Sequence, residues 1–277
     1  MLLSEELKIS FHPINEEGIY WWTIFTHILE EFVLRGYKPP EPIGKRFEEI
    51  QIPKYDLEGL PNAVESFKKM SLIQGQFLLK YGKYKYLQSC LEEGKIRIMP
   101  ASSYDDPSLN HAIRDAELEI KFSGIPSEIK MEVFDGKTGQ PKGFITPTGN
   151  LNYTLKSRTS YYVYCLANKY SLRMYGDFEA DCCLVIKDPD KFIQKLIKVF
   201  SSQLTDYKVI VNDCNYFDPL NARADNLDVY FSKHFRFSYQ KEFRIIWLPP
   251  KPAAKLEPVF LELGNLAEFC EIIRLKE

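Results

Sequence analysis

The chain of 277 residues is rich in apolar side chains, since 45% of it is hydrophobic and 14% is aromatic. This composition argues against a disordered chain and suffices for the core of one large domain, or of a domain with an appendage. The formal net charge of −2 argues against a globally basic nucleic-acid binder, although it leaves a local basic groove open. No apolar run reaches membrane-spanning length, and no basic, apolar signal sequence is seen at Met1. We therefore expect a cytosolic protein.

The cysteines and histidines give no sign of a metal site. The six cysteines are scattered and show no C-x-x-C spacing, and the four histidines show no pair with ligand spacing. We therefore expect no bound metal, and we expect the cysteines to behave as small buried apolar residues.

The first 70 residues are expected to form a helical appendage. The stretch "IYWWTIFTHILEEFVLRGY" spaces its apolar residues for a packed helix that ends near Gly36, and the proline-rich link "KPPEPIG" follows it. A second helix is expected from about Leu57 to Met70. No domain-separating linker comes next, so we expect this appendage to pack on a second domain, residues 71–277.

From residue 76 onward the pattern alternates strands with short helices. Strands are expected at "QFLLKY", "KIRIMP", "SYYVYCLA", "DCCLVI" and residues 207–211, with an edge strand at "EPVFLEL". Helices are expected at "KYKYLQSCLEEG", which Gly94 closes, from Asp188-Pro189 to about Ser201, and near residues 225–234. The segment 108–122 is expected to begin as a helix, and "EIKMEVFDGKTGQPKGFIT" to form a hairpin. This order predicts an α+β fold with mixed, largely antiparallel pairing.

The stretch "FSYQKEFRII", residues 237–246, carries polar residues at alternate positions of an otherwise apolar strand. Because successive strand side chains point to opposite faces, Gln240, Glu242 and Arg244 are expected to share one face. One interpretation is a half-buried strand whose polar face meets water, with Glu242 and Arg244 as a weak surface pair. The other is a functional site.

Three segments together resemble a bacterial family of mono-ADP-ribosyltransferase-like proteins. They are "LLKYGKYKYLQSCLEEGKIRIMPASSYDDP", "YCLANKYSLRMYGDFEADCCLVI" and "YQKEFR", and the resemblance covers about residues 76–249. It implies the transferase-like fold and NAD as a substrate. The chain departs from the family pattern in having Ala167 where the family has serine, and Lys80-Tyr81 where better-known transferases have His or Arg.

The resemblance also implies roles for residues of the last segment. Cleavage of the nicotinamide–ribose bond develops positive charge on the sugar, which a fixed carboxylate can stabilise. Glu242 takes that catalytic role, and Gln240 would reach the incoming nucleophile. Arg244 would orient Glu242 or contact a phosphate, with a purely structural salt bridge as the alternative.

Other candidate NAD-binding residues come from earlier segments. Lys80 and Tyr81 are candidates for the adenosine-side ribose and the pyrophosphate, and only one of these neighbours is expected to point into a given face. Tyr164 and Tyr175 offer rings for stacking on nicotinamide, with core packing as the alternative for each. In the loop "PASSYDDPSLNHAIRDAELE", Ser102 and Arg114 are candidate pocket residues, although turn formation explains its composition as well.

Three functions remain open from the sequence. The first is transfer of ADP-ribose from NAD to a macromolecule by an intracellular toxin or defence effector, which a protein partner could neutralise. The acceptor is expected to be RNA or single-stranded nucleic acid slightly more than protein, because "KYGKYKY" interleaves lysine with tyrosine. The second is an NAD glycohydrolase, and the third is a non-enzymatic interaction module.

Overall fold

The computed structural model of the chain describes residues 59–110, 112–124, 131–149, 151–219, 222 and 224–275. The chain divides between Leu57 and Glu58 into two compact units, and all described residues belong to the second. The expected appendage over residues 1–70 lies mostly outside the described residues and stays a prediction. Its last part forms helix α3 (Leu60–Lys69), which packs against strand β14 (Cys270–Arg274).

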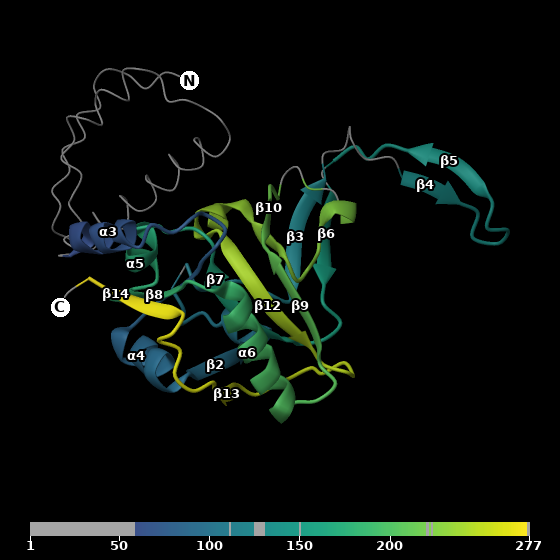
Figure 1. Cartoon of the computed structure of the whole chain (residues 1–277). Coiled ribbons are helices and arrows are strands. Elements are labelled where there is room, and N and C mark those ends of the chain that lie inside the picture. Colours follow the sequence, from purple (N-terminus) through teal and green to yellow (C-terminus); the bar gives the residue numbers. More distant parts are fainter. Residues whose placement is uncertain are drawn as a thin grey trace, which may run out of the picture. The chain divides into compact units, whose positions relative to one another are not determined.

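An eight-stranded sheet organises the described part of the chain (Figure 1). Its main path runs through β13 (Val259–Glu262), β2 (Lys95–Pro100), β7 (Tyr162–Ala167), β1 (Leu78–Gly82), β8 (Cys182–Ile186) and β14. Two further strands, β12 (Glu242–Leu248) and β9 (Lys208–Asp213), join it because β12 pairs with both β7 and β9. All of these pairings are antiparallel.

Strand β7 pairs with three neighbours, and this arrangement opens the sheet. β12 runs along the whole of β7, from Glu242 opposite Ala167 to Trp247 opposite Tyr162. β2 pairs only with the first two residues of β7, and β1 pairs only with its last. Since β12 occupies one edge of β7, β1 and β2 share the other edge and diverge from each other along it. The sheet is therefore split beside the second half of β7.

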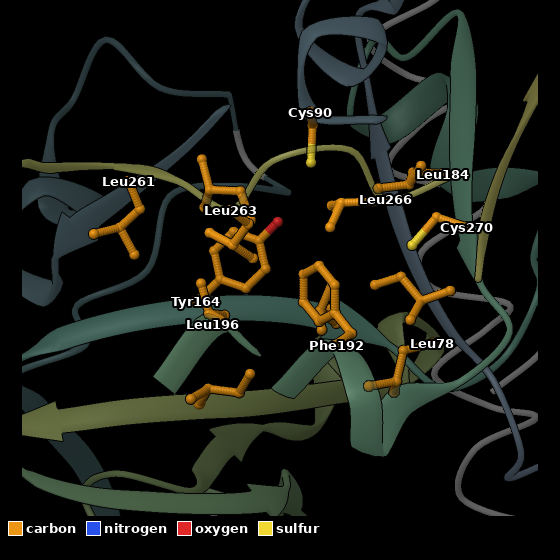
Figure 2. Close-up of a cluster of buried hydrophobic side chains, with 14 of the residues drawn as sticks. Leu78, Cys90, Tyr164, Leu184, Phe192, Leu196, Leu261, Leu263, Leu266 and Cys270 are labelled. Atoms are coloured by element: carbon orange, nitrogen blue, oxygen red, sulfur yellow. The ribbon is translucent and has the colours of Figure 1, made fainter. Parts of the chain in front are cut away.

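Both faces of β7 are buried, because its side chains alternate between two apolar clusters. Tyr162, Tyr164 and Leu166 belong to the larger cluster, which includes residues of helices α4 (Tyr84–Glu93) and α6 (Pro189–Gln203) (Figure 2). Val163, together with Tyr161 just before the strand, belongs to the smaller cluster on the other face. This alternation decides which side chains of β7 can reach a site on either face.

Local signals set the ends of both core helices. The Asp188 side chain accepts a hydrogen bond from the backbone nitrogen of Lys191 (3.0 Å), and proline occupies the first turn of α6. Gly94 ends α4 in the left-handed conformation, with φ of 69°, which glycine adopts without strain. The helices expected at these positions are confirmed.

Three small sheets and short helices complete the described elements. The sheets pair β3 (Glu119–Gly124) with β6 (Leu151–Lys156), β4 (Met131–Phe134) with β5 (Pro141–Ile145), and β10 (Asn215–Phe217) with β11 (Ser232–His234). The last pair is parallel. The short helices are α5 (Arg173–Asp177) and the 3-10 helices η1 (Ala101–Asp105), η3 (Ala224–Asn226) and η4 (Phe235–Gln240).

Two expected helices are wrong. The described part of segment 108–122 begins with turns, in which the Asp106 side chain accepts from the Ser108 nitrogen and the Asn110 side chain accepts from Ala112 and Ile113. Such side chain to backbone hydrogen bonds compete with a helix. The described part of segment 225–234 ends as strand β11 because it pairs with β10.

The coarse fold prediction is confirmed, since the described residues form a mixed α+β structure with mostly antiparallel sheets. All six cysteines are free, and five of them are buried, so they pack as apolar residues. Among the described residues, no helix is long and apolar enough to cross a membrane.

Candidate functional site

A cavity of about 200 Å³ lies where the sheet splits beside β7. Strand β1 contributes Leu79, Lys80 and Tyr81 to its wall, and the end of β7 contributes residues 165–167. The remaining wall residues are Tyr104, Ala112, Ile113, Glu117, Met174, Phe178, Lys233, Gln240 and Glu242. Polar side chains from distant parts of the sequence therefore meet in one place.

The structure brings four of the nine predicted site residues to this cavity: Lys80, Tyr81, Gln240 and Glu242. The other five, Ser102, Arg114, Tyr164, Tyr175 and Arg244, are not part of its wall. The described geometry explains the place of each of them.

Glu242 is a buried carboxylate whose two oxygens both accept hydrogen bonds. Oε1 accepts from Arg244 Nε (2.7 Å), and Oε2 accepts from Lys233 Nζ (2.7 Å). The backbone nitrogen of Glu242 donates to the hydroxyl of Tyr216 on β10 (2.7 Å). Side chain and backbone are thus both held, which leaves the carboxylate little freedom to rotate. The surface-pair interpretation of this strand is wrong, because Glu242 is 5% exposed and Arg244 is 1% exposed.

Arg244 lies behind Glu242 on the same strand face, as the alternation predicts. Its guanidinium also forms a two-pronged ion pair with Glu117, with Nη2 2.8 Å from Oε1 and Nη1 2.7 Å from Oε2. Nη1 further donates to the carbonyl of Tyr230 (2.8 Å). With these partners and no place in the cavity wall, Arg244 is a buried ion-pair partner of Glu242 and Glu117, and its role in orienting Glu242 stays a prediction.

Gln240 reaches the cavity by a route that differs from the expected one. It ends helix η4 instead of lying in the strand, and Lys241 adopts the left-handed conformation (φ 44°) before β12 begins at Glu242. Both hydrogens of the Gln240 amide are engaged, because Nε2 donates to the Ala112 carbonyl (2.8 Å) and to the Tyr239 hydroxyl (3.3 Å), while Oε1 accepts from Lys233 (3.1 Å). A nucleophile that donates to Oε1 could use its second lone pair, whereas a contact with Nε2 would replace one of these bonds.

Lys80 and Tyr81 both belong to the cavity wall, and as neighbours in strand β1 they are expected to point to opposite faces of the sheet. Lys80 Nζ donates to the carbonyl of Cys165 (2.7 Å) and lies 4.6 Å from the ring centre of Tyr164. The Tyr81 hydroxyl accepts a hydrogen bond from the backbone nitrogen of Ser171 (3.0 Å). Lys80 thus supplies a cation at this wall and Tyr81 an aromatic ring.

Tyr164 and Tyr175 are buried core residues, which agrees with the core-packing alternative for each of them. Tyr164 points to the larger apolar cluster, which is the face of β7 opposite to Val163 (Figure 2). Tyr175 is fully buried, and its ring meets the Tyr81 ring edge-on at 5.1 Å. The aromatic rings that do line the cavity with Tyr81 are those of Tyr104 and Phe178.

Ser102 and Arg114 also lie outside the cavity wall. Ser102 is exposed in helix η1, so its turn-forming alternative accounts for it. Arg114 is exposed and lies 3.9 Å from the carboxylate of Asp105. The neighbours of Arg114 in the chain, Ala112 and Ile113, are the part of this loop that reaches the cavity.

Sequence reasoning missed three polar wall residues: Tyr104, Glu117 and Lys233. Glu117 lies in a segment that was expected to begin as a helix, and Lys233 lies in one that was expected to be helical throughout. The stretch "FSKHF" around Lys233 places three consecutive polar residues between two aromatic residues, so it carries no period-2 strand signal. No local sequence pattern identifies Glu117 as a site residue, because it reaches the site only through its ion pair with the distant Arg244.

The charges in the cavity wall drive the pKa values of its two carboxyl groups apart. Burial opposes ionisation of Glu242, but the charges of Arg244 and Lys233 outweigh it and hold the pKa of Glu242 below its ordinary value. Burial raises the pKa of Glu117 to about 7, against the opposing charge of Arg244. Burial also lowers the pKa of Lys80. The site therefore combines a fixed anion with a second carboxyl group that burial makes easier to protonate.

Comparison with known proteins identifies no relative, since no family model, no curated protein and no solved structure matches the chain. Among the described residues, no group of three His, Cys, Asp or Glu side chains could hold a metal ion. The cavity and its charges are thus the basis for a functional argument.

Proposed function

We propose that the protein cleaves the nicotinamide–ribose bond of NAD in this cavity and transfers ADP-ribose to a macromolecular acceptor. The observation that carries the proposal is Glu242, an immobilised carboxylate at the cavity wall with a lowered pKa. Its place in a motif that resembles the transferase family adds support.

The chemistry of NAD suits a carboxylate that stays ionised. The glycosidic nitrogen of NAD is positively charged, so nicotinamide leaves with the bonding electron pair as a neutral molecule and needs no proton. The positive charge that develops on the ribose is what requires stabilisation, and a preorganised anion supplies it. The acceptor then forms the new bond to the same ribose carbon and loses its proton. Glu242 fits the electrostatic part of this reaction better than the role of an acid.

The rest of the wall supports the same substrate. Lys80 offers a cation for a phosphate, and the rings of Tyr81, Tyr104 and Phe178 offer apolar surface for a flat ring. Ligand pockets usually measure roughly 300–1,000 Å³. A cavity of about 200 Å³ is therefore suited to the nicotinamide–ribose half of NAD, with the adenosine half outside it.

Hydrolysis of NAD is the second candidate function, and two observations favour it. The Gln240 amide is engaged with Lys233, Ala112 and Tyr239, so it is not poised for a large acceptor. Glu117 lines the same cavity, and burial raises its pKa, which makes this carboxyl group a better acceptor for a proton from water if its ion pair with Arg244 opens. Water would then replace the macromolecule as the acceptor.

For the transfer reaction we favour RNA or single-stranded nucleic acid as the acceptor. Lys85 lies 4.7 Å from the ring centre of Tyr86, and this tyrosine is 64% exposed at the start of α4. An exposed ring beside a cation can stack on an unpaired base. Such an activity would suit an intracellular toxin or defence effector that a protein partner neutralises.

The decisive experiment incubates the purified protein with NAD labelled in its adenylate phosphate, with and without cell extract. Release of nicotinamide tests bond cleavage, labelled macromolecules indicate transfer, and free ADP-ribose alone indicates hydrolysis. Nuclease and protease treatment then identify the labelled acceptor. Glu242→Gln serves as the impaired variant, and Glu262→Gln, an exposed glutamate on β13, serves as its matched control. If the wild-type protein neither binds NAD nor releases nicotinamide in either condition, the proposed function is rejected in favour of an interaction module.

A further inference from the structure

Lys233 occupies the centre of the polar cluster at the cavity wall. Its ammonium nitrogen lies 2.7 Å from Glu242 Oε2, 3.1 Å from Gln240 Oε1 and 3.6 Å from Asp115 Oδ2. Two of the three N–H donors of the ammonium group are thus used in hydrogen bonds, and Asp115 adds an ion-pair contact. The side chain is 5% exposed, and its nitrogen lies 4.6 Å from the ring centre of Phe237. Lys233 is therefore a buried residue whose polar contacts fix it in the site.

Both the backbone and the side chain of Lys233 are linked to Glu242, the backbone through Tyr216 and the side chain directly. Lys233 lies on β11 directly opposite Tyr216 of β10 in the parallel pair. The Tyr216 hydroxyl accepts from the backbone nitrogen of Glu242, while the Lys233 side chain donates to the Glu242 carboxylate. The two short strands thus hold the start of β12 at two points.

We propose that Lys233 is a positioning residue, which fixes the Glu242 carboxylate and the Gln240 amide in one arrangement at the cavity wall. Its catalytic consequence rests on the proposed function, whereas its effect on Glu242 does not. Without Lys233, the Glu242 carboxylate keeps Arg244 and the weak thiol donor Cys165 as side-chain partners, and Oε2 loses its charged donor. The Gln240 amide loses the one contact that orients its oxygen.

The positive charge of Lys233 favours the ionised form of Glu242. Removal of this charge should therefore raise the pKa of Glu242. The charged and titratable groups that face Glu242 come from its own strand and from six other segments: Arg244, Lys233, Asp115, Glu117, Lys80, Tyr104, Cys165, Cys214 and Tyr216. Arg244, Lys233 and Lys80 are the cations of this set. Loss of a cation at 2.7 Å raises the pKa of a carboxyl group, typically by one unit or more.

The test is a titration of the Glu242 carboxyl carbon by NMR, assigned through its backbone resonances, in the wild type and two variants. The wild-type carboxyl group is expected to titrate below the ordinary glutamate value. Lys233→Met should raise its pKa by about one unit or more, and Lys233→Arg should restore most of the difference. The control is Lys241→Met, which removes an exposed cation next to Glu242 in the sequence and should shift the titration by no more than about 0.3 unit.

Nicotinamide release against pH gives the second readout. Because the reaction needs ionised Glu242, the acidic limb of the Lys233→Met profile should move to higher pH, whereas lower stability alone would reduce activity without moving the limb. An unchanged Glu242 titration in Lys233→Met, or an equal shift in Lys241→Met, would overturn the role of Lys233. If Lys233→Met does not fold, the wild type and Lys233→Arg decide. The role of Lys233 is then overturned if Glu242 has the ordinary glutamate pKa in the wild type, or if its pKa in Lys233→Arg is far from the wild-type value. A wild type that releases no nicotinamide rejects the proposed function, and the titration still decides the role of Lys233.

Discussion

Replacement of Arg244 by methionine tests the buried ion network without reference to any activity. Methionine keeps most of the length and the apolar stem of arginine but removes the guanidinium. The Glu117 carboxylate then loses both of its Arg244 contacts, and Glu242 Oε1 loses its donor. Both carboxylates remain almost fully buried, with Lys233 as the nearest remaining cation.

The expected cost follows from this geometry. Removal of one partner from a buried ion pair leaves an uncompensated charge and typically costs about 3–5 kcal/mol. The free energy of unfolding of a typical domain is roughly 5–15 kcal/mol, so the loss is a large share of the total. Arg244→Met should therefore lower the free energy of unfolding by about 3–5 kcal/mol at neutral pH. Arg97→Met, an exposed arginine on β2, should change it by no more than about 0.5 kcal/mol.

The loss of stability in Arg244→Met should depend on pH in a definite direction. In the wild type the pKa of Glu242 is lowered on folding, so its contribution to stability is present above the pKa of the unfolded chain and is lost as pH falls through the folded-state value. In Arg244→Met both carboxyl pKa values rise in the folded state, so the folded variant binds protons as pH falls. The difference in stability between variant and wild type should therefore shrink from about pH 8 to about pH 5.

The assay is urea unfolding of both proteins and the Arg97→Met control over this pH range, followed by circular dichroism. The midpoint should fall while the slope stays constant, which separates a stability effect from a change in compactness. A loss below about 1 kcal/mol at neutral pH, or a loss that does not vary with pH, would refute the view that Arg244 balances two buried carboxylates.

The remaining predictions concern the reaction and the core. Glu242→Gln should lower nicotinamide release roughly 100- to 1000-fold while NAD binding in calorimetry stays close to normal, and Glu262→Gln should change neither; near-normal release by folded Glu242→Gln would contradict the catalytic role. Asp188→Ala removes the hydrogen bond to the Lys191 nitrogen and should cost about 1 kcal/mol in urea unfolding. Leu196→Ala empties a fully buried position on α6 and should cost about 2–5 kcal/mol, so a loss below that range would indicate a core that collapses around the gap.

Features with local causes could be predicted from the sequence. The Asp188-Pro189 start of α6 and the Gly94 end of α4 depend on the conformations of those residues alone, and both were placed correctly. The shared face of Glu242 and Arg244 follows from strand alternation. The α+β class follows from the order of such elements.

Features that depend on distant partners could not be predicted. Gln240 was expected within the strand because no local signal showed that Lys241 would take a left-handed conformation and end the regular alternation. Tyr164 and Cys165 lie next to each other, yet only the latter lines the cavity, and the choice depends on which face α6 covers. Lys233 is recognised as part of the site only once β11 pairs with β10.

The three-way pairing of β7 has a consequence for synthesis on the ribosome. Its partners β1 and β2 precede it in the chain, but β12 follows it after α5, β8, α6, β9, β10 and β11. During synthesis, the edge of the apolar strand Tyr162–Ala167 that pairs with β12 therefore stays unpaired until β12 has left the exit tunnel. Unpaired apolar edges promote association between nascent chains, and pairing across long sequence separations is slow. A chain released before Glu242 would lack both the carboxylate of the candidate site and the strand that protects this edge.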